Sequence, residues 1–336
     1  MAMSTAPESP ISRKVVRLGV LIVLVIAVYS IGWYFAAEYL KNRILTFFAG
    51  GNPAGVTASC EDATMGGYPF RFRLNCSRLA VDDHFQGVAA SFGPVRAAAQ
   101  IYNPGQIVWE MDAPAEIRSA LGYNTALDWT NMQSSFRIGL SGLSRSSLVL
   151  EDLSATLTST VSSLQVQMAV PSAQSHVRQN EGNLDYATLV RDMVVSIGGE
   201  KIALPPISAS LDATLADKGG LLDPRIAQDQ RLYGTKGEIR RMVVDIGEGR
   251  VLTLSGPFEV GEDGLLSGRI KVEVEQVRAW RDAVKTAYPE QADMVDNVAN
   301  VLRALAFGRD NSEAEITIQN GVAALGFIPL GQIPPL

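Results

Sequence analysis

Residues 18–37 read LGVLIVLVIAVYSIGWYFAA, a run without any Asp, Glu, Lys or Arg. At about 1.5 Å per residue, a helix of this length reaches roughly 30 Å, which is the thickness of the hydrocarbon core of a bilayer. The run therefore predicts a transmembrane helix. Residues 38–52 are predicted to continue it as a juxtamembrane helix and linker, which ends within Gly50-Gly51-Asn52-Pro53.

The charges beside this run predict its orientation. Arg13, Lys14 and Arg17 precede it in a short polar tail, residues 1–17, so the positive-inside rule places the tail in the cytoplasm and the rest of the chain on the other side. A cleaved signal peptide is the alternative, but the apolar core of such a peptide is usually about 7–15 residues long. The position that should hold a small residue ahead of a cleavage site near Ala36 is aromatic. An uncleaved anchor is therefore predicted.

The composition excludes one large class of partner. The chain has 336 residues, 47% of them hydrophobic and 19% charged, and its net charge is −6. Proteins that bind nucleic acid need clustered Lys and Arg to contact phosphates. No nucleic-acid partner is therefore predicted, and the chain after the anchor is expected to be a water-soluble domain.

Two cysteines, Cys60 and Cys76, follow soon after the anchor. Such a pair forms a disulfide, supplies half of a metal site, or stays as two buried thiols. A zinc site needs about four good ligands, and the two histidines, His84 and His176, are far apart in the sequence, so no metal is predicted. Because export would place the pair in an oxidising compartment, the disulfide is the favoured interpretation.

Most of the remaining chain predicts antiparallel strands. Residues 70–77 alternate, with Phe70, Phe72, Leu74 and Cys76 on one face, which is the period-two pattern of a half-buried strand. Asn320-Gly321 is a strong hairpin signal. Further strands are predicted at residues 88–101, 106–111, 135–140, 146–158 (broken), 164–170, 237–246, 251–260, 265–274, 313–319 and 322–327.

Three helices are predicted to accompany this sheet, at residues 184–197, 277–288 and 290–307, the first because its apolar residues fall on one helical stripe. The expected fold class is α+β. A transmembrane helix precedes a large, mostly antiparallel, twisted β-sheet in residues 53–330, followed by an irregular tail, residues 331–336. The sequence leaves open whether the sheet forms an open groove or half-barrel, or is covered by its own helices.

The segment between the cysteines, CEDATMGGYPFRFRLNC, carries a family resemblance. Its cysteines and the motif Gly66-Gly67-Tyr68-Pro69-Phe70-Arg71 resemble the bacterial domain-of-unknown-function family 2125. Residues 256–258 (GPF) and 263–268 (DGLLSG) are similar to the C-terminal half of that family. The resemblance implies a bacterial inner-membrane protein with a periplasmic domain, and it implies no reaction. A weaker likeness links the chain to AsmA-like envelope proteins, which resemble open β-grooves that hold lipid acyl chains.

The residues of this motif also predict a local structure without any function. Glycine supplies the positive φ of a tight turn. Pro69 is expected to open a strand at its first residue, where a missing N–H is tolerated. Arg71 and Arg73 are expected on the solvent-exposed face of that strand.

Signatures of catalysis and of cofactor binding are missing from the sequence. It has no Gly-x-Ser-x-Gly elbow, of which residues 139–142 (GLSG) contain only a part, and no phosphate-binding glycine motif. The acidic pairs at 82–83, 151–152 and 262–263 fall at turns or strand ends and are expected to be solvated, as are His84 and His176. No catalytic residue and no cofactor are predicted, and the protein is expected not to be an enzyme.

Three hypotheses about function follow. The leading one is a non-enzymatic envelope protein that binds a lipid or another apolar ligand in a curved sheet. The second is a membrane-tethered scaffold that docks another envelope protein. A hydrolase is a remote third, which would require Ser, His and Asp side chains to converge in one pocket.

Overall fold

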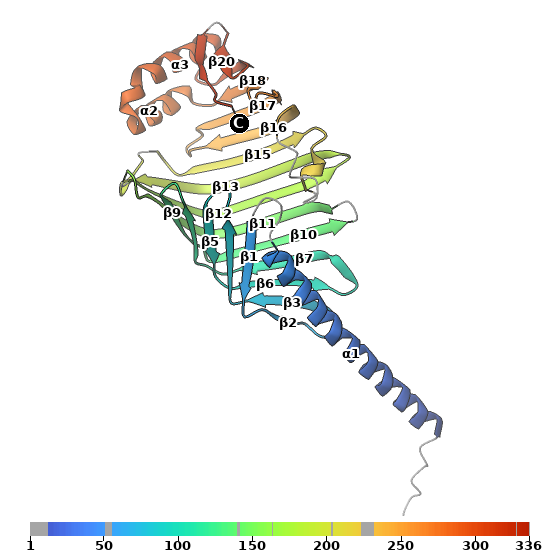
Figure 1. Ribbon diagram of the computed structural model, residues 1–336. Coiled ribbons are helices and arrows are strands. Elements are labelled where there is room, and N and C mark those ends of the chain that lie inside the picture. Colours follow the sequence, from blue (N-terminus) through green and yellow to red (C-terminus); the bar gives the residue numbers. More distant parts are fainter. Residues whose placement is uncertain are drawn as a thin grey trace, which may run out of the picture.

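The computed structural model describes residues 13–50, 56–139, 142–162, 164–202, 204–222, 232–326 and 328–335. One long helix, α1 (Arg13–Ala49), leads into a large antiparallel sheet, and a pair of shorter helices lies at the far end of that sheet (Figure 1). The predicted fold class is confirmed. The predicted tail residues 1–12 and the residues 51–53 of the predicted helix end lie outside the described residues.

Helix α1 is continuous over 37 residues. It therefore includes the predicted transmembrane run and its predicted continuation, and it ends at Ala49, next to Gly50. Within the described part of the chain, it is the one helix that is long and apolar enough to cross a membrane. Its side chains are exposed from Val15 to Val28, and contacts with the sheet start only after that point.

The first strands of the sheet come in pairs that are two halves of one bent strand. Each bent strand is antiparallel to the next bent strand along the chain. The strand that follows them, β11 (Gly142–Ser159), is unbroken and pairs with both halves of the last bent strand. The pairs are β1 (Val56–Glu61) with β2 (Thr64–Gly66), β3 (Arg71–Cys76) with β4 (Arg78–Asp83), β5 (Val88–Phe92) with β6 (Val95–Gln100), β7 (Asn103–Met111) with β8 (Ala115–Ser119), and β9 (Tyr123–Asp128) with β10 (Asn131–Gly139).

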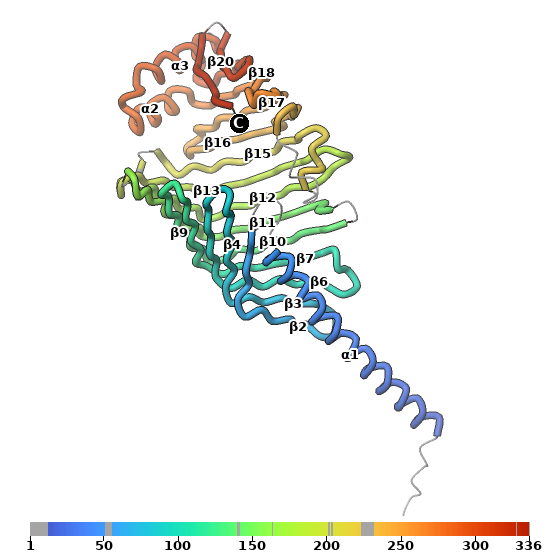
Figure 2. The backbone as a smooth tube through the Cα atoms, in the orientation of Figure 1, coloured from blue at the N-terminus to red at the C-terminus, as the bar shows by residue number. Residues whose placement is uncertain are grey.

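The bends of these strands lie side by side and form a crease across the sheet. Backbone hydrogen bonds join one bend to the next, from Ser77 N–H to Glu61 O (2.9 Å) and from Gly93 N–H to Pro114 O (3.0 Å). Figure 2 shows how the chain bends where β3 continues into β4. The crease consists of residues 62–63, 77, 93–94, 112–114, 129–130 and 152, and it continues through Pro171 and Asp192, which are unpaired between neighbouring strands.

The sheet then continues as a simple meander to the end of the described chain. Each long strand is antiparallel to the one before it, and the short β14 (Glu200–Lys201) pairs with the end of β13. The strands are β12 (Gln165–Asn180), β13 (Asn183–Ile197), β15 (Ile207–Leu215), β16 (Thr235–Asp245), β17 (Val251–Val260), β18 (Leu266–Val274), β19 (Ser312–Gln319), β20 (Val322–Leu325) and β21 (Ile328–Gln332). The helical segments are η1 (Gly219–Leu222), α2 (Val277–Ala287), η2 (Pro289–Gln291) and α3 (Ala292–Leu305).

The sheet folds toward one face along the crease. Ala115 and Leu127 from one half pack in the same cluster as Leu150 and Met132 from the other half, around the buried Trp129. The indole of Trp129 donates a hydrogen bond to Met111 O (2.8 Å). Because side chains of both halves meet on this face, it is the concave one, and it is called the inner face below.

The helix predicted at residues 184–197 is wrong, because this segment is strand β13, paired on both sides with β12 and β15. The pairing register shifts between Val190 and Met193, at the point where Asp192 has a φ of 51°. Such a bulge adds one residue to a period-two pattern. Apolar residues on one face of the strand then recur at intervals of three and four, which imitates a helical stripe.

The bounds of the other predicted strands and helices differ less from the observed ones. The strand predicted as broken at residues 146–158 is the continuous β11, and β21 includes Gly331 and Gln332 of the predicted irregular tail. The predicted helices at 277–288 and 290–307 correspond to α2 and to η2 with α3. The prediction missed β1, β2, β4, β8, β9, β14, β15 and β21.

The crease gives the first testable prediction, at Gly93. A Cβ added there would lie 2.5 Å from Asp112 O and 2.9 Å from Ala113 O, both in the backbone of the neighbouring bend. Since backbone atoms cannot move aside cheaply, Gly93→Ala should lower the free energy of unfolding by about 2 kcal/mol, the usual cost of overpacking. Urea unfolding of the full chain in detergent would measure the change. In Gly139→Ala, the matched control, the added Cβ has nothing within 4 Å and should change stability little.

Candidate functional site

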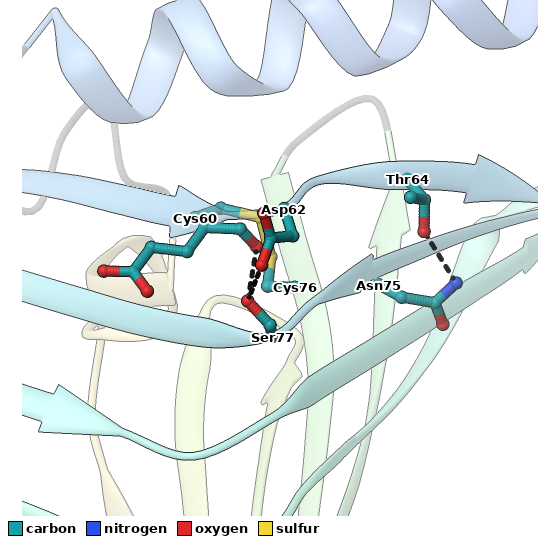
Figure 3. Close-up of a disulfide and its surroundings, with 7 residues drawn as sticks. Cys60, Asp62, Thr64, Asn75, Cys76 and Ser77 are labelled. Carbon is teal, nitrogen blue, oxygen red and sulfur yellow. Dashed lines mark hydrogen bonds between the residues drawn. A yellow bond between two sulfur atoms is a disulfide. The ribbon is translucent and has the colours of Figure 1, made fainter.

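The two cysteines join the two halves of the sheet next to the crease. Cys60 on β1 and Cys76 on β3 form a disulfide, with their Cα atoms 5.3 Å apart, and Cys76 is buried. Close by, the Ser77 hydroxyl donates to the Asp62 carboxylate (2.8 Å) and the Asn75 amide to Thr64 (3.4 Å), as Figure 3 shows. The bond therefore fixes the bend between the edge strand and its neighbour.

The motif residues 66–71 pack against α1. The Tyr29 hydroxyl donates to Pro69 O, and the hydroxyls of Ser30 and Tyr68 are 2.8 Å apart. Trp33 meets the Tyr68 ring edge-on, with ring centroids 5.5 Å apart. The motif thus forms a turn that docks the sheet onto the helix. This contact was not foreseen, because nothing in either segment marks its partner some forty residues away.

The turn itself differs in part from the expectation. Gly67 has a φ of 99°, and a Cβ there would lie 2.7 Å from Arg71 O, so this position requires glycine. Pro69 does not open a strand, because β3 begins at Arg71. Phe70 lies in the turn and is 67% exposed, so it does not share the inner face with Cys76. Arg71 and Arg73 are exposed, in line with the sequence.

The inner face carries a continuous apolar row that crosses the sheet from strand to strand. Its members are half-buried or buried, and only Ser146 among them is polar. In order they are Phe72, Ala99, Ile107, Phe136, Ser146, Val177, Tyr186, Ala213 and Ile239. The next row on the opposite, outer face is Arg73, Ala98, Val108, Ser135, Ser147, His176, Ala187, Asp212 and Arg241.

Helices meet this inner row at both of its ends. At its start, Phe72 stacks on Trp33 of α1, with ring centroids 5.6 Å apart. At its end, Ile239 packs against the core beneath α2 and α3, which contains Val272 and Trp280. Figure 1 shows α2 and α3 at the opposite end of the sheet from α1. The apolar row therefore runs between the anchor helix and a helical pair at the far end.

A cavity of about 290 Å³ lies at this far end, between the helical pair and the sheet. It is close to the lower limit of small-molecule sites, which is about 300 Å³. The indole N–H of Trp280 in its wall is buried and has no hydrogen-bond partner among the described residues. The other lining residues, apart from Arg281, are apolar: Leu252, Val274, Val277, Val284, Met294, Val295, Val298, Ala299 and Leu302.

The outer face carries a charged cluster around Asp185 on β13. The Asp185 side chain is only 6% exposed and accepts hydrogen bonds from Arg178 (3.0 Å), Thr214 (2.8 Å) and Arg240 (3.2 Å). Burial alone would raise the pKa of Asp185, but these hydrogen bonds outweigh it and lower the pKa to about 2. The cluster therefore holds a carboxylate that stays charged at any physiological pH.

The charged cluster lines a cavity on the outer face, and a serine and a histidine also meet in it. His176 Nδ1 lies 3.0 Å from Ser147 Oγ. A catalytic triad needs an acid that orients the histidine, but Asp185 and Asp212 in the cavity wall both bind Arg240 instead. His84 lies 3.4 Å from Asp82 and is exposed. No group of three or more metal-ligating side chains occurs in the part of the chain that the structure describes. Leu140 and Ser141 lie outside that part.

The inner row was predicted in part. Phe72 was assigned to a core-facing side from its alternation, and Ile107 and Phe136 fall inside predicted strands. Val177 was missed because its strand was expected to end at residue 170, and Tyr186 was assigned to a helix. Alternation continued past Pro171 would have been the signal for Val177.

Comparison with known proteins gives one match. The model of the family described as uncharacterized protein conserved in bacteria (DUF2125) matches residues 33–334. No curated protein and no solved structure matches the chain. The match begins at Trp33, which contacts the motif turn, and includes every strand of the described sheet. The chain belongs to the DUF2125 family of bacterial proteins.

Proposed function

We propose that this protein is anchored in the bacterial inner membrane by α1 and binds a lipid or another apolar ligand, without catalysis, on the inner face of its periplasmic sheet. The observation that carries the proposal is the apolar row from Phe72 to Ile239. It extends from the helix that would lie in the membrane to an apolar cavity under α2 and α3. A face of this kind suits an acyl chain, which gains free energy in proportion to the apolar area it removes from water.

Three unsatisfied indoles support the proposal. Trp33 lies at the start of the inner face, Trp109 in a neighbouring row of that face and Trp280 at its far end, and each has a buried N–H with no partner among the described residues. A buried donor without an acceptor costs about 1–3 kcal/mol. The ester and head-group oxygens of a bound lipid would supply an acceptor to the indole nearest to its head group.

The anchoring and the compartment have support of their own. Helix α1 is exposed and apolar over a length that suits a bilayer. Three basic residues lie on the N-terminal side of its apolar run, whereas Lys41 and Arg43 on the other side are accompanied by the acidic Glu38. The Cys60–Cys76 disulfide fits the oxidising periplasm. The absence of catalysis is part of the proposal, because His176 beside Ser147 lacks an orienting acid.

Photocrosslinking in growing cells tests the lipid site. The photoreactive amino acid p-benzoylphenylalanine would replace Tyr186, which faces inward, or Ala187, which is next along the strand and faces outward. After irradiation, mass spectrometry of the purified protein should find lipid adducts on position 186 and few on position 187. Equal adduct formation, or none at 186, would refute the proposal. Adducts to a single protein at either position would favour the scaffold hypothesis instead.

A charge on the inner face should abolish this labelling. Val177 lies directly opposite Tyr186, and His176 opposite Ala187. A carboxylate next to a bound acyl chain must be desolvated, so Val177→Glu should reduce lipid adducts at position 186 by at least about tenfold, which corresponds to 1.4 kcal/mol. His176→Glu, the control on the outer face, should leave them unchanged. Labelling that survives both substitutions would show that the lipid lies elsewhere.

A further inference from the structure

The contact between α1 and the motif turn lies within the predicted transmembrane run and not beyond its C-terminal end. From Leu18, the first residue after Arg17, the helix rises by about 16 Å to Tyr29 and by about 22 Å to Trp33. The hydrocarbon core is about 30 Å thick. A helix that crosses it from Leu18 therefore holds Tyr29 and Trp33, and with them the motif turn, roughly 8–14 Å below the outer hydrocarbon surface.

The charges on α1 agree with this depth. No charged residue occurs between Arg17 and Glu38, and Glu38 forms an ion pair with Lys41 (2.8 Å). These first charges after the apolar run lie closer to the C-terminal end of α1 than the residues that contact the turn. The sheet therefore descends beside α1 past the level at which water-exposed charges begin.

The side chains of the turn suit such a position. Residues 67–70, Gly-Tyr-Pro-Phe, carry no charge, and the rings of Tyr68 and Phe70 are 49% and 67% exposed. Beside them is the turn between β6 and β7, where Ile101 N–H donates to Phe70 O (3.0 Å) and Tyr102 is 74% exposed. Exposed rings without charge suit contact with acyl chains, because burying their apolar surface in the membrane is favourable.

Part of the backbone of the turn is paired within the protein, which matters in an apolar environment because every unpaired polar group there costs several kcal/mol. The carbonyl of Gly67 accepts from Arg71 N–H (3.1 Å), that of Pro69 from the Tyr29 hydroxyl, and that of Phe70 from Ile101 N–H. Pro69 has no N–H to satisfy. Arg71 follows at once and is exposed, at the place where a guanidinium can extend to lipid phosphates.

From these observations we infer that the turn at residues 67–70 and the neighbouring turn at Ile101 and Tyr102 insert into the outer leaflet of the bilayer beside α1. This inference rests on the proposed anchoring. It assigns the family motif a role: the motif sets the sheet at a fixed depth and places the start of the apolar inner face, at Phe72, next to the acyl chains. A lipid would then enter that face without crossing water.

Fluorescence quenching by lipids tests the insertion. The full chain would be reconstituted in vesicles of phosphatidylcholine and phosphatidylglycerol, with a polarity-sensitive fluorophore on a single introduced thiol, because the disulfide leaves no native thiol free. The labelled variants are Phe70→Cys, Tyr102→Cys, Val25→Cys in the exposed part of α1, and Phe85→Cys. Phe85 is 79% exposed and follows β4, at the opposite end of the bent strand that starts at Arg71, so it is the matched control.

A lipid with a nitroxide midway along its acyl chain should quench the labels at positions 70 and 102 by about twofold or more, as expected for side chains that lie roughly 8–14 Å below the outer hydrocarbon surface. A nitroxide near the chain end should quench position 25 best, and neither should affect position 85. Quenching at 25 without quenching at 70 and 102 would overturn this inference and leave the anchor intact. No quenching at position 25 would instead contradict the anchoring itself.

Discussion

Replacing Cys60 and Cys76 together by alanine is expected to lower the free energy of unfolding by about 3 kcal/mol. The bond closes a loop between residues that are 16 apart in sequence, and its removal gives the unfolded chain back the corresponding conformational freedom. The same bond holds β1 to β3 beside the crease, where α1 also contacts the sheet. The loss should therefore appear first as opening of this edge.

Urea unfolding of the full chain in detergent, with and without reductant, would measure this effect. Reductant should lower the unfolding midpoint of the wild type to that of the double variant, and leave the double variant unchanged. A free thiol in protein purified from membranes without reductant would contradict the disulfide and, with it, the proposed periplasmic location. Cys76→Ala alone should resemble the double variant, because either substitution removes the bond.

The parts of the fold that the sequence predicted are those with local signals. The strands at 237–246, 251–260 and 265–274 alternate cleanly between glycine-rich turns, and α2 and α3 have an apolar stripe of their own. The missed strands β4, β8 and β9 are halves of bent strands, only five or six residues long. Each half is short, and the crease that joins it to its other half interrupts the alternation.

Less of the candidate site than of the fold was predictable, because its residues come together through contacts between separate strands and segments. Val177 and Tyr186 join the same row as Phe136 only through the pairing register, and one bulge can shift a residue from one face to the other. At Asp192 such a bulge turned a strand pattern into an apparent helix. The docking of Tyr68 on Tyr29, Ser30 and Trp33 depends on a contact between distant segments, for which a single sequence carries no signal.

Replacing Asp185 by asparagine is expected to lower the free energy of unfolding by about 3 kcal/mol at neutral pH, because removing one partner from a buried ion pair costs about 3–5 kcal/mol. The lower end applies because Arg178 and Arg240, which would lose their carboxylate, are 53% and 39% exposed and can turn to water. The asparagine amide would also face the donors of Arg178 and Asn180. Asp128→Asn is the control: Asp128 is exposed and should change stability by less than about 0.5 kcal/mol.

The pH dependence of this stability difference shows whether Asp185 acts through its negative charge or through its packing. The pKa of Asp185 is about 2 in the folded protein and about 3.9 in an unfolded chain, so the folded state favours the ionised carboxylate. The resulting stabilisation, about 2 kcal/mol, is fully present above about pH 4 and is lost as the pH falls toward 2. The difference in unfolding free energy between wild type and Asp185→Asn should therefore shrink from about 3 to about 1 kcal/mol over that range. Urea unfolding at a series of pH values would measure it, and a difference that does not change with pH would show that Asp185 acts through its shape rather than its charge.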